Sequence, residues 1–139
     1  MKKKIFLAVL SIGLLSAAAV YYYVFIYSAN HRRSAEDEQC IVVSAADLVK
    51  QYQSSEATAN AKFLDKALQV TGVVGEVKKD PTGNTTVTIK SDDAFAGVFC
   101  TLKKTETTLP VVGSTIVVKG FCKGFLSDVV ITDAVLKNN

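Results

Sequence analysis

The first 30 residues contain one long run of apolar positions bounded by positive charge. Three lysines at positions 2 to 4 precede the run, and no charged side chain occurs from Ile5 to Ala29. A helix over these residues would be roughly 37 Å long at about 1.5 Å per residue, which exceeds the ~30 Å hydrocarbon core of a bilayer. Residues 1–30 are therefore predicted to be a single transmembrane anchor that contacts the lipid bilayer through residues 5–29.

Five aromatic rings lie near the C-terminal end of this run, where amphipathic rings favour the headgroup layer: Tyr21, Tyr22, Tyr23, Phe25 and Tyr27. The alternative is a cleaved signal peptide, with Ala17–Ala19 as its cleavage site. Cleavage there would leave Val20–Tyr27 as a new apolar terminus, which favours an uncleaved anchor. The lysines before the run predict a cytoplasmic N-terminus and an extracytoplasmic domain, in the bacterial periplasm or at the cell surface.

A helical pattern follows at Ser44. Its hydroxyl is a candidate N-cap, and Asp47 lies in the first turn, where a carboxylate favours the helix dipole. A helix is predicted from about Ala45 to about Lys66, with a bend at Ser54–Ser55 that would divide it. Its apolar positions recur at helical spacing: Leu48, Tyr52, Ala59 and Phe63.

From Ala67 onward the apolar positions alternate with period two. Runs of β-branched residues separated by Gly, Pro, Asp and Ser predict five strands, at about 67–75, 85–89, 97–102, 115–122 and 129–136. This mainly β pattern with one N-terminal helix favours a five-stranded Greek-key OB-fold barrel over residues 44–139, joined to the anchor by a polar linker, 31–43. Gly72 would suit a bend that lets the first strand serve both sheets. The pattern alone does not separate this barrel from an SH3-like one.

Four segments hold the glycine and β-branched positions of this barrel: 59–73, Gly97–Cys100, Val117–Gly124 and Asp128–Ile131. They resemble the tRNA_anti-like family of bacterial OB-fold proteins, and the resemblance covers roughly Ser44 to Leu136. It implies the OB fold and an exported or membrane-anchored protein. It implies no chemistry, because a fold does not determine a function.

The positive charge of the chain lies mostly beside the apolar run. The formal net charge is +3, but from Gln39 onward eleven lysines are balanced by ten acidic residues. Nucleic-acid-binding domains usually concentrate positive charge on one face. The charge therefore does not predict a nucleic-acid surface, and nucleic acid is not an expected partner.

The predicted domain is poor in catalytic side chains. The single histidine, His31, lies in the linker, so the barrel cannot contain a Ser-His-Asp or Cys-His arrangement. The three cysteines do not have metal-ligand spacing, and Asp92 and Asp93 would point to opposite faces of a strand or lie in a solvated turn. We expect no catalytic residue, no enzymatic activity, no metal and no cofactor.

An OB-fold barrel generally binds its ligand on the outer face of strands 2 and 3 and on the loops that join strands 1–2 and 4–5. The loops would be 78–84 and 123–127. The candidate ligand-binding residues are Lys78, Lys79, Lys90, Phe99, Lys123 and Phe125. The strand face would also present Thr86, Thr88, Thr101 and Lys103. Single-strand binders stack bases on several aromatic rings, so the alternative is a solvated threonine and lysine face.

Cys100 and Cys122 both lie on predicted strands and share their faces with apolar neighbours. A disulfide between them is permitted if the domain lies outside the cytoplasm, and it would stabilise the barrel by ~3 kcal/mol in the chain-entropy model. Cys40 would then remain unpaired near the membrane. The alternative is two buried free thiols.

These observations favour a membrane-anchored, extracytoplasmic and non-enzymatic OB-fold binding module with an unidentified small-molecule or other ligand. Another envelope protein is a candidate partner besides the bilayer. Two alternatives remain open: a nucleic-acid-binding OB-fold domain tethered to the cytoplasmic face of the membrane, and a structural subunit of a membrane complex.

Overall fold

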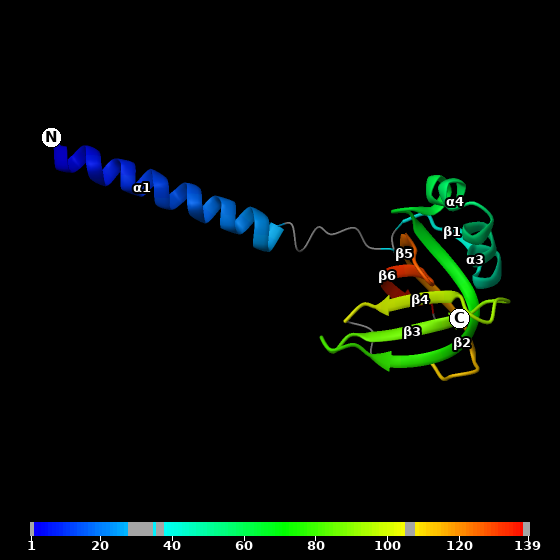
Figure 1. The fold of residues 1–139 in the computed structure, drawn as a ribbon. Coiled ribbons are helices and arrows are strands. Elements are labelled where there is room, and N and C mark those ends of the chain that lie inside the picture. The colour runs from blue at the N-terminus through cyan, green and yellow to red at the C-terminus, as the bar shows by residue number, and fades with distance from the viewer. Residues whose placement is uncertain (1, 28–34, 36–37, 105–107, 138–139) are drawn as a thin grey trace. The chain divides into compact units, whose positions relative to one another are not determined.

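The computed structural model describes residues 2–27, 35, 38–104 and 108–137 of the chain (Figure 1). The chain forms two compact units, residues 1–33 and residues 34–139. The first contains the apolar segment and the second contains the barrel.

The N-terminal unit is helical through the apolar run. Helix α1 spans Lys2–Tyr21 and continues as the π-helical segment η1, Tyr22–Tyr27. In the described part of the chain, one helix, Lys3–Tyr27, is long and apolar enough to cross a membrane. This helix lies within the predicted anchor, residues 1–30, of which residues 1 and 28–30 lie outside the described residues.

Two short helices precede the barrel, α3 (Ala45–Ser54) and α4 (Glu56–Phe63). The predicted cap is confirmed, because the Asp47 N–H donates to the Ser44 hydroxyl at 3.1 Å. Ser55 caps α4 in the same way, so the predicted bend is the boundary between two helices. The second helix ends three residues before the predicted Lys66, and the chain turns at Asp65, whose φ is 57°.

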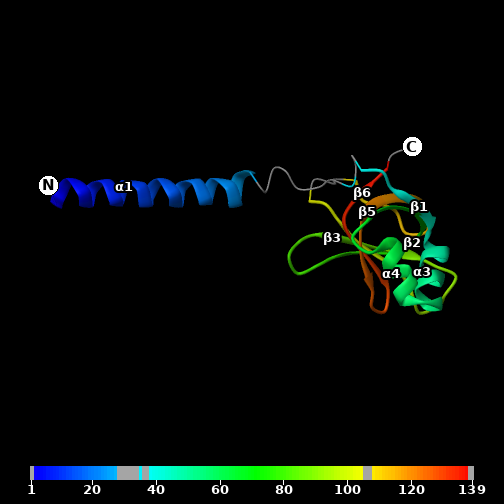
Figure 2. The ribbon, with the colours of Figure 1, turned by 90° about the horizontal axis from the view of Figure 1, so that it is seen from above.

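Five strands form a closed barrel (Figures 1 and 2). Their order is β2-β3-β4-β6-β5, and β5 pairs back to β2. The β4–β6 pair is parallel and the other four pairs are antiparallel. This is the predicted Greek-key OB-fold barrel. The strands are β2 (Ala67–Lys79), β3 (Thr85–Lys90), β4 (Gly97–Leu102), β5 (Thr115–Phe125) and β6 (Val129–Leu136).

Strand β2 serves both sides of the barrel, as predicted. Its residues 67–73 pair with β5 and its residues 74–79 pair with β3, with a register shift between Val74 and Glu76. Gly72 lies where the strand changes partner. A Cβ at Gly72 would overlap Ile89 Cγ2 and approach Ala45 Cβ to 3.0 Å, so glycine permits the close approach of β3 and α3.

A sixth strand, β1 (Ile41–Ser44), pairs in parallel with β2 from Ile41↔Leu68 to Ser44↔Thr71. Most of this strand lies within the predicted polar linker, 31–43. Regular structure that pairs with the barrel therefore begins before the predicted domain boundary at residue 44. Four residues are too few for an alternating pattern to show, which is why the sequence did not reveal this strand. Linker residues 31–34, 36 and 37 lie outside the described residues.

The two helices cover one end of the barrel and complete its core. Tyr52 of α3 is 2% exposed, and its ring lies 6.2 Å from the Phe63 ring of α4 and 5.8 Å from the Phe125 ring of β5. Helix residues therefore form one hydrophobic cluster with the inward-facing residues of the strands. The largest fully buried side chains of this cluster include Phe63, Leu48, Leu68, Ile89, Ile131 and Val98.

Candidate ligand-binding face and basic cleft

The predicted strand face is present on the outside of β3 and β4. Thr88 lies opposite Phe99, and Thr86 lies opposite Thr101. The residues between them, such as Val87 and Cys100, belong to the buried core, so these four side chains point outward. Phe99 is half-buried on this face, and Thr86 is buried.

Lys90 is exposed at the end of β3 and extends over the neighbouring strand. A Cβ at Gly75 of β2 would lie 2.9 Å from Lys90 Cγ, so the glycine leaves room for the stem of the lysine. The Lys90 stem packs on the backbone while its ammonium group remains available to solvent.

Lys78 and Lys79 end β2 at the other end of this face. The Lys78 ammonium forms an ion pair with Glu76 at 2.7 Å, and both side chains are more than half exposed. Such a pair contributes little to stability and leaves the local charge near zero. Lys79 lines a cleft beside the following turn.

The turn between β2 and β3 is built around Asp80. One carboxylate oxygen, Oδ1, accepts hydrogen bonds from Thr82 N–H, the Thr82 hydroxyl and Asn84 N–H at 2.7–2.9 Å. The other oxygen accepts from the Asn84 side-chain amide at 3.1 Å. These bonds, the one from the Thr82 hydroxyl above all, lower the pKa of Asp80 to about 2. The turn is therefore held by its own carboxylate, with Gly83 at a φ of 84°.

A cleft of about 440 Å³ lies between this turn and the end of β4. Lys79, Lys103 and Lys104 are among the residues that line it, and the Lys103 N–H donates to the Ala134 carbonyl at 2.8 Å, which fixes the end of β4. Three lysines that line one cleft favour the binding of an anionic group. We call this site the basic cleft; its other lining residues are Thr82, Gly83, Asn84, Thr85 and Leu109.

Lys104 is the member of the basic cleft that sequence reasoning missed. The signal was available in the hairpin register, because Thr86 opposite Thr101 places residues 103 and 104 beside residues 84 and 83. Counting outward along the two strands from that pair would have located both lysines next to the turn.

The other two candidate residues, Lys123 and Phe125, lie in β5 and not in the predicted loop. The strand continues because Gly124 adopts a φ of 103°, which lets it bulge without breaking. Lys123 forms an ion pair with Asp65 at 2.7 Å, and Phe125 stacks on Tyr52. Phe125 is thus part of the packing at the helix-covered end of the barrel.

The predicted disulfide between Cys100 and Cys122 is absent, because all three cysteines of the chain are free. Ile131 of β6 pairs with Cys100 on one side and with Cys122 on the other. One strand therefore separates the two cysteines, and two strand spacings of about 4.8 Å exceed the Cα separation that a disulfide allows.

Both thiols are instead buried in the core. The Cys122 sulfur lies 3.3 Å from the Tyr52 hydroxyl, within a hydrogen bond. Burial, followed by this bond, raises the pKa of Tyr52. Burial also raises the pKa of the Cys100 thiol to about 12, so its environment does not favour a reactive thiolate at neutral pH.

Comparison with solved structures finds a similar fold in a protein from Klebsiella pneumoniae subsp. pneumoniae MGH 78578, described as a candidate nucleic acid-binding lipoprotein. The TM-score is 0.59 and the sequence identity 14%, and the match covers 71% of this chain and 92% of that one. Comparison with curated proteins finds no match. The model of the tRNA_anti-like family matches residues 1–135. The chain, with its closed five-stranded barrel, therefore belongs to the tRNA_anti-like family.

Proposed function

We propose that this protein is a membrane-tethered, non-enzymatic OB-fold module that binds an anionic ligand in the basic cleft. The observation that carries the proposal is the convergence of Lys79, Lys103 and Lys104 beside a turn held in place by Asp80. Thr85 also lines the cleft, and its hydroxyl is a candidate further donor. A phosphate, sulfate or carboxylate group would receive charge-assisted hydrogen bonds from these side chains.

The apolar helix supports the tether. From Lys3 to Tyr27 its mean hydropathy reaches 2.1, and its apolar side chains with described burial are exposed. Exposed apolar surface costs about 25 cal/mol per Å² in water, and a bilayer removes that cost. The lysines at its N-terminus favour a cytoplasmic N-terminus and an extracytoplasmic barrel, where another envelope protein could bind it. The description of the Klebsiella protein as a lipoprotein is consistent with such a location.

A nucleic acid is the second candidate ligand, favoured by the description of the Klebsiella protein. A phosphate backbone would fit the charge of the basic cleft. Stacking of bases requires aromatic rings on the outer face, however, and of the two candidate rings Phe125 is engaged with Tyr52. Of the candidate rings this leaves Phe99, and Phe95 is exposed in the loop between β3 and β4, so we expect nucleic acid to bind mainly through its charge.

A binding experiment tests the proposed ligand class. Full-length protein in nanodiscs of uncharged lipid is titrated with fluorescein-labelled heparin oligosaccharide, polyphosphate and single-stranded DNA or RNA at physiological salt. The variant Lys103→Glu/Lys104→Glu reverses two charges of the basic cleft and should weaken binding by roughly tenfold or more. The control Lys50→Glu/Lys66→Glu makes the same change in net charge on two exposed lysines outside the cleft.

An equal loss in both variants would show that binding follows net charge alone and would contradict a specific cleft. Absence of binding to every anion below the millimolar range would also contradict it. Selective binding of one nucleic acid that is lost in Phe99→Ala would favour the second candidate.

The tether and its orientation have a separate test. A reporter that is active only after export is fused after Asn139, and the membrane fraction is washed with alkaline carbonate. We expect an active reporter and retention in the pellet. A reporter that is inactive, with the protein still in the pellet, would place the barrel in the cytoplasm. Mass spectrometry that finds a chain beginning at Val20 would show a cleaved signal peptide.

A further inference from the structure

Strand β1 has one open edge. It pairs in parallel with β2 through Ile41↔Leu68 to Ser44↔Thr71, and no other strand among the described residues pairs with it. The five barrel strands, by contrast, are closed on one another. Edge strands that remain monomeric usually contain a lysine, a proline or a bulge. Ile41–Ser44 contains none of these, so its length of four residues is the one feature of the strand that limits pairing with another strand.

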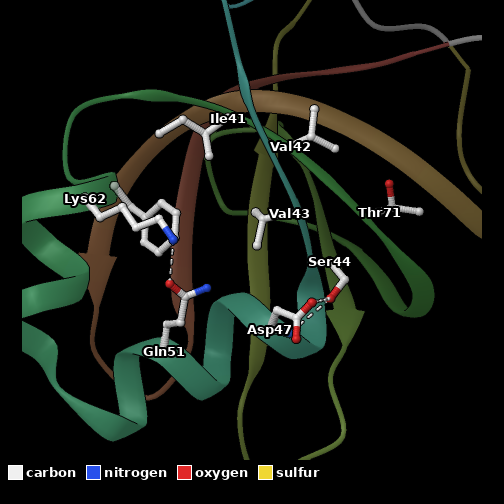
Figure 3. A pocket seen from close by; sticks show the side chains of 9 residues that line it. Ile41, Val42, Val43, Ser44, Asp47, Gln51, Lys62 and Thr71 are labelled. Atoms are coloured by element: carbon white, nitrogen blue, oxygen red, sulfur yellow. Dashed lines mark hydrogen bonds between the residues drawn. The ribbon is translucent and has the colours of Figure 1, made fainter.

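A cleft of about 430 Å³ lies along this edge, between β1 and the two helices (Figure 3). Figure 3 shows Ile41 and Val43 on the side of the strand that faces the helices, with Val42 on the other side. Val42 is 70% exposed. A strand added at this edge would therefore place its own side chains on both sides of β1. The helical walls of the cleft are Asp47 and Gln51 of α3 and Lys62 and Phe63 of α4.

The two ends of this cleft have opposite charges. Figure 3 shows Lys62 on the helix side of the cleft, where its ammonium donates to Gln51 Oε1 at 2.9 Å and lies 4.9 Å from the Phe63 ring centre. Asp47 lies by Ser44, whose hydroxyl donates to it at 2.8 Å. Both charged side chains belong to the cleft lining. The cleft thus has a positive side at Lys62 and a negative side at Asp47.

We propose that the β1 edge binds β1 of a second copy of this chain, antiparallel and about a two-fold axis at Val42. In that register Val42 lies opposite its own counterpart, and Ile41 lies opposite Val43 of the other copy. Residues directly opposite one another share a face in an antiparallel pair, so apolar side chains meet on both faces. The reversal of direction also brings Lys62 of each copy to the Asp47 end of the other. The edge is therefore complementary to itself in both shape and charge.

This inference rests on the proposed tether. Four residues per strand bury far less than the ~1,600 Å² of a standard interface, so the pairing would be weak between freely diffusing molecules. Two copies anchored in one bilayer have a high effective concentration, which compensates for a small interface. We therefore expect pairing at membrane densities and not in dilute solution.

Cysteine crosslinking in native membranes tests the pairing. Val42→Cys is placed in a Cys40→Ser full-length background and oxidised with copper phenanthroline. The control is Leu126→Cys in the same background, because Leu126 is 83% exposed but lies between β5 and β6. We expect Val42→Cys to give a species of twice the 14.9 kDa chain mass, at several times the yield of the control. An adduct of any other mass, or a yield equal to the control, would overturn the inference.

A charge exchange tests the register independently. Lys62→Asp and Asp47→Lys should each lower the Val42→Cys crosslinking yield severalfold, and the double variant should restore it. Circular dichroism checks that each variant remains folded. Failure of the double variant to recover more than either single variant would overturn the proposed register.

Carbonate extraction of the same membranes separates this inference from the tether. Protein in the pellet without the crosslink would overturn the pairing alone. Protein in the supernatant would contradict the tether, and the crosslink would then be measured on concentrated purified chain. Its absence there would overturn the pairing as well.

Discussion

The contact between Tyr52 and Cys122 joins helix α3 to strand β5, and its removal gives a defined loss of stability. The Tyr52 hydroxyl lies 3.3 Å from the Cys122 sulfur, inside a core where Tyr52 is 2% exposed and Cys122 is fully buried. Tyr52→Phe keeps the ring, with its contacts to Phe63 and Phe125, and removes only the hydroxyl. We expect it to lower the free energy of unfolding by about 1 kcal/mol, the usual net value of one hydrogen bond.

Cys122→Ala should cost more than Tyr52→Phe. It leaves the Tyr52 hydroxyl buried without its sulfur partner, which costs about 1–3 kcal/mol, and it also removes the packing of the sulfur. The double variant Tyr52→Phe/Cys122→Ala has no Tyr52 hydroxyl that could be left buried without a hydrogen-bond partner. The double variant should therefore be less destabilised than the sum of the single variants, by about 0.5–1.5 kcal/mol.

Urea unfolding of residues 34–139, followed by circular dichroism, measures this coupling. The unit contains the closed barrel and its own core, so its unfolding reports on the barrel. Cys100 provides the matched control, because it is equally buried and is separated from Cys122 by strand β6. The losses in free energy of unfolding caused by Tyr52→Phe and by Cys100→Ala should add to within about 0.5 kcal/mol in the double variant. Additivity in the Tyr52 and Cys122 pair as well would show that the hydroxyl and the thiol are not energetically coupled.

Three further predictions follow from the same core. Cys100 and Cys122 should both be alkylated in denatured protein without a reductant, and both should be protected in the folded protein; a disulfide-linked peptide in a digest would contradict this. Burial raises the pKa of the Cys100 thiol to about 12, whereas the unfolded thiol loses its proton near pH ~8.5. The contribution of Cys100 to the free energy of unfolding should therefore be fully present below pH ~8.5. Above that pH it should fall by up to about 1.4 kcal/mol per pH unit. Cys100→Ala should remove that part of the alkaline loss, as urea unfolding at pH 8 and pH 10 would show, and an unchanged slope would contradict the assignment. Gly72→Ala should lower the melting temperature by several degrees, because its Cβ would overlap Ile89. In Gly83→Ala the Cβ meets no atom within 4 Å, and the only cost is the strain of a φ of 84°. A larger drop in melting temperature for Gly83→Ala than for Gly72→Ala would contradict the close approach at Gly72.

The helix caps and the barrel could be predicted because their signals are local. Ser44 and Asp47 specify a helix start within four residues, and period two specifies each barrel strand. Strand β1 could not be predicted, because a run of four residues has no pattern of its own and owes its structure to the adjacent β2.

The disulfide was a different kind of error. The predicted OB-fold topology already places strand β6 between the strands that contain Cys100 and Cys122. Burial and face were inferred correctly for both residues, but strand order decides which inward-facing residues are neighbours. The predicted loop 123–127 is wrong at Phe125 because Gly124 forms a bulge and β5 continues to Phe125.

The candidate site was predicted in part. The outward direction of Thr88 and Phe99 followed from strand alternation. The basic cleft depends on the juxtaposition of the β2–β3 turn with the end of β4, which a reading of each loop by itself does not show.

Chemical-shift mapping tests the basic cleft most directly. Residues 34–139 labelled with ¹⁵N are titrated with a heparin oligosaccharide or polyphosphate, and the amide signals are followed to saturation. We expect the largest shifts at Lys79, Thr82, Thr85 and Lys103, and we expect them to disappear in Lys103→Glu/Lys104→Glu. Shifts centred on the helices α3 and α4, or shifts that persist in that variant, would contradict it.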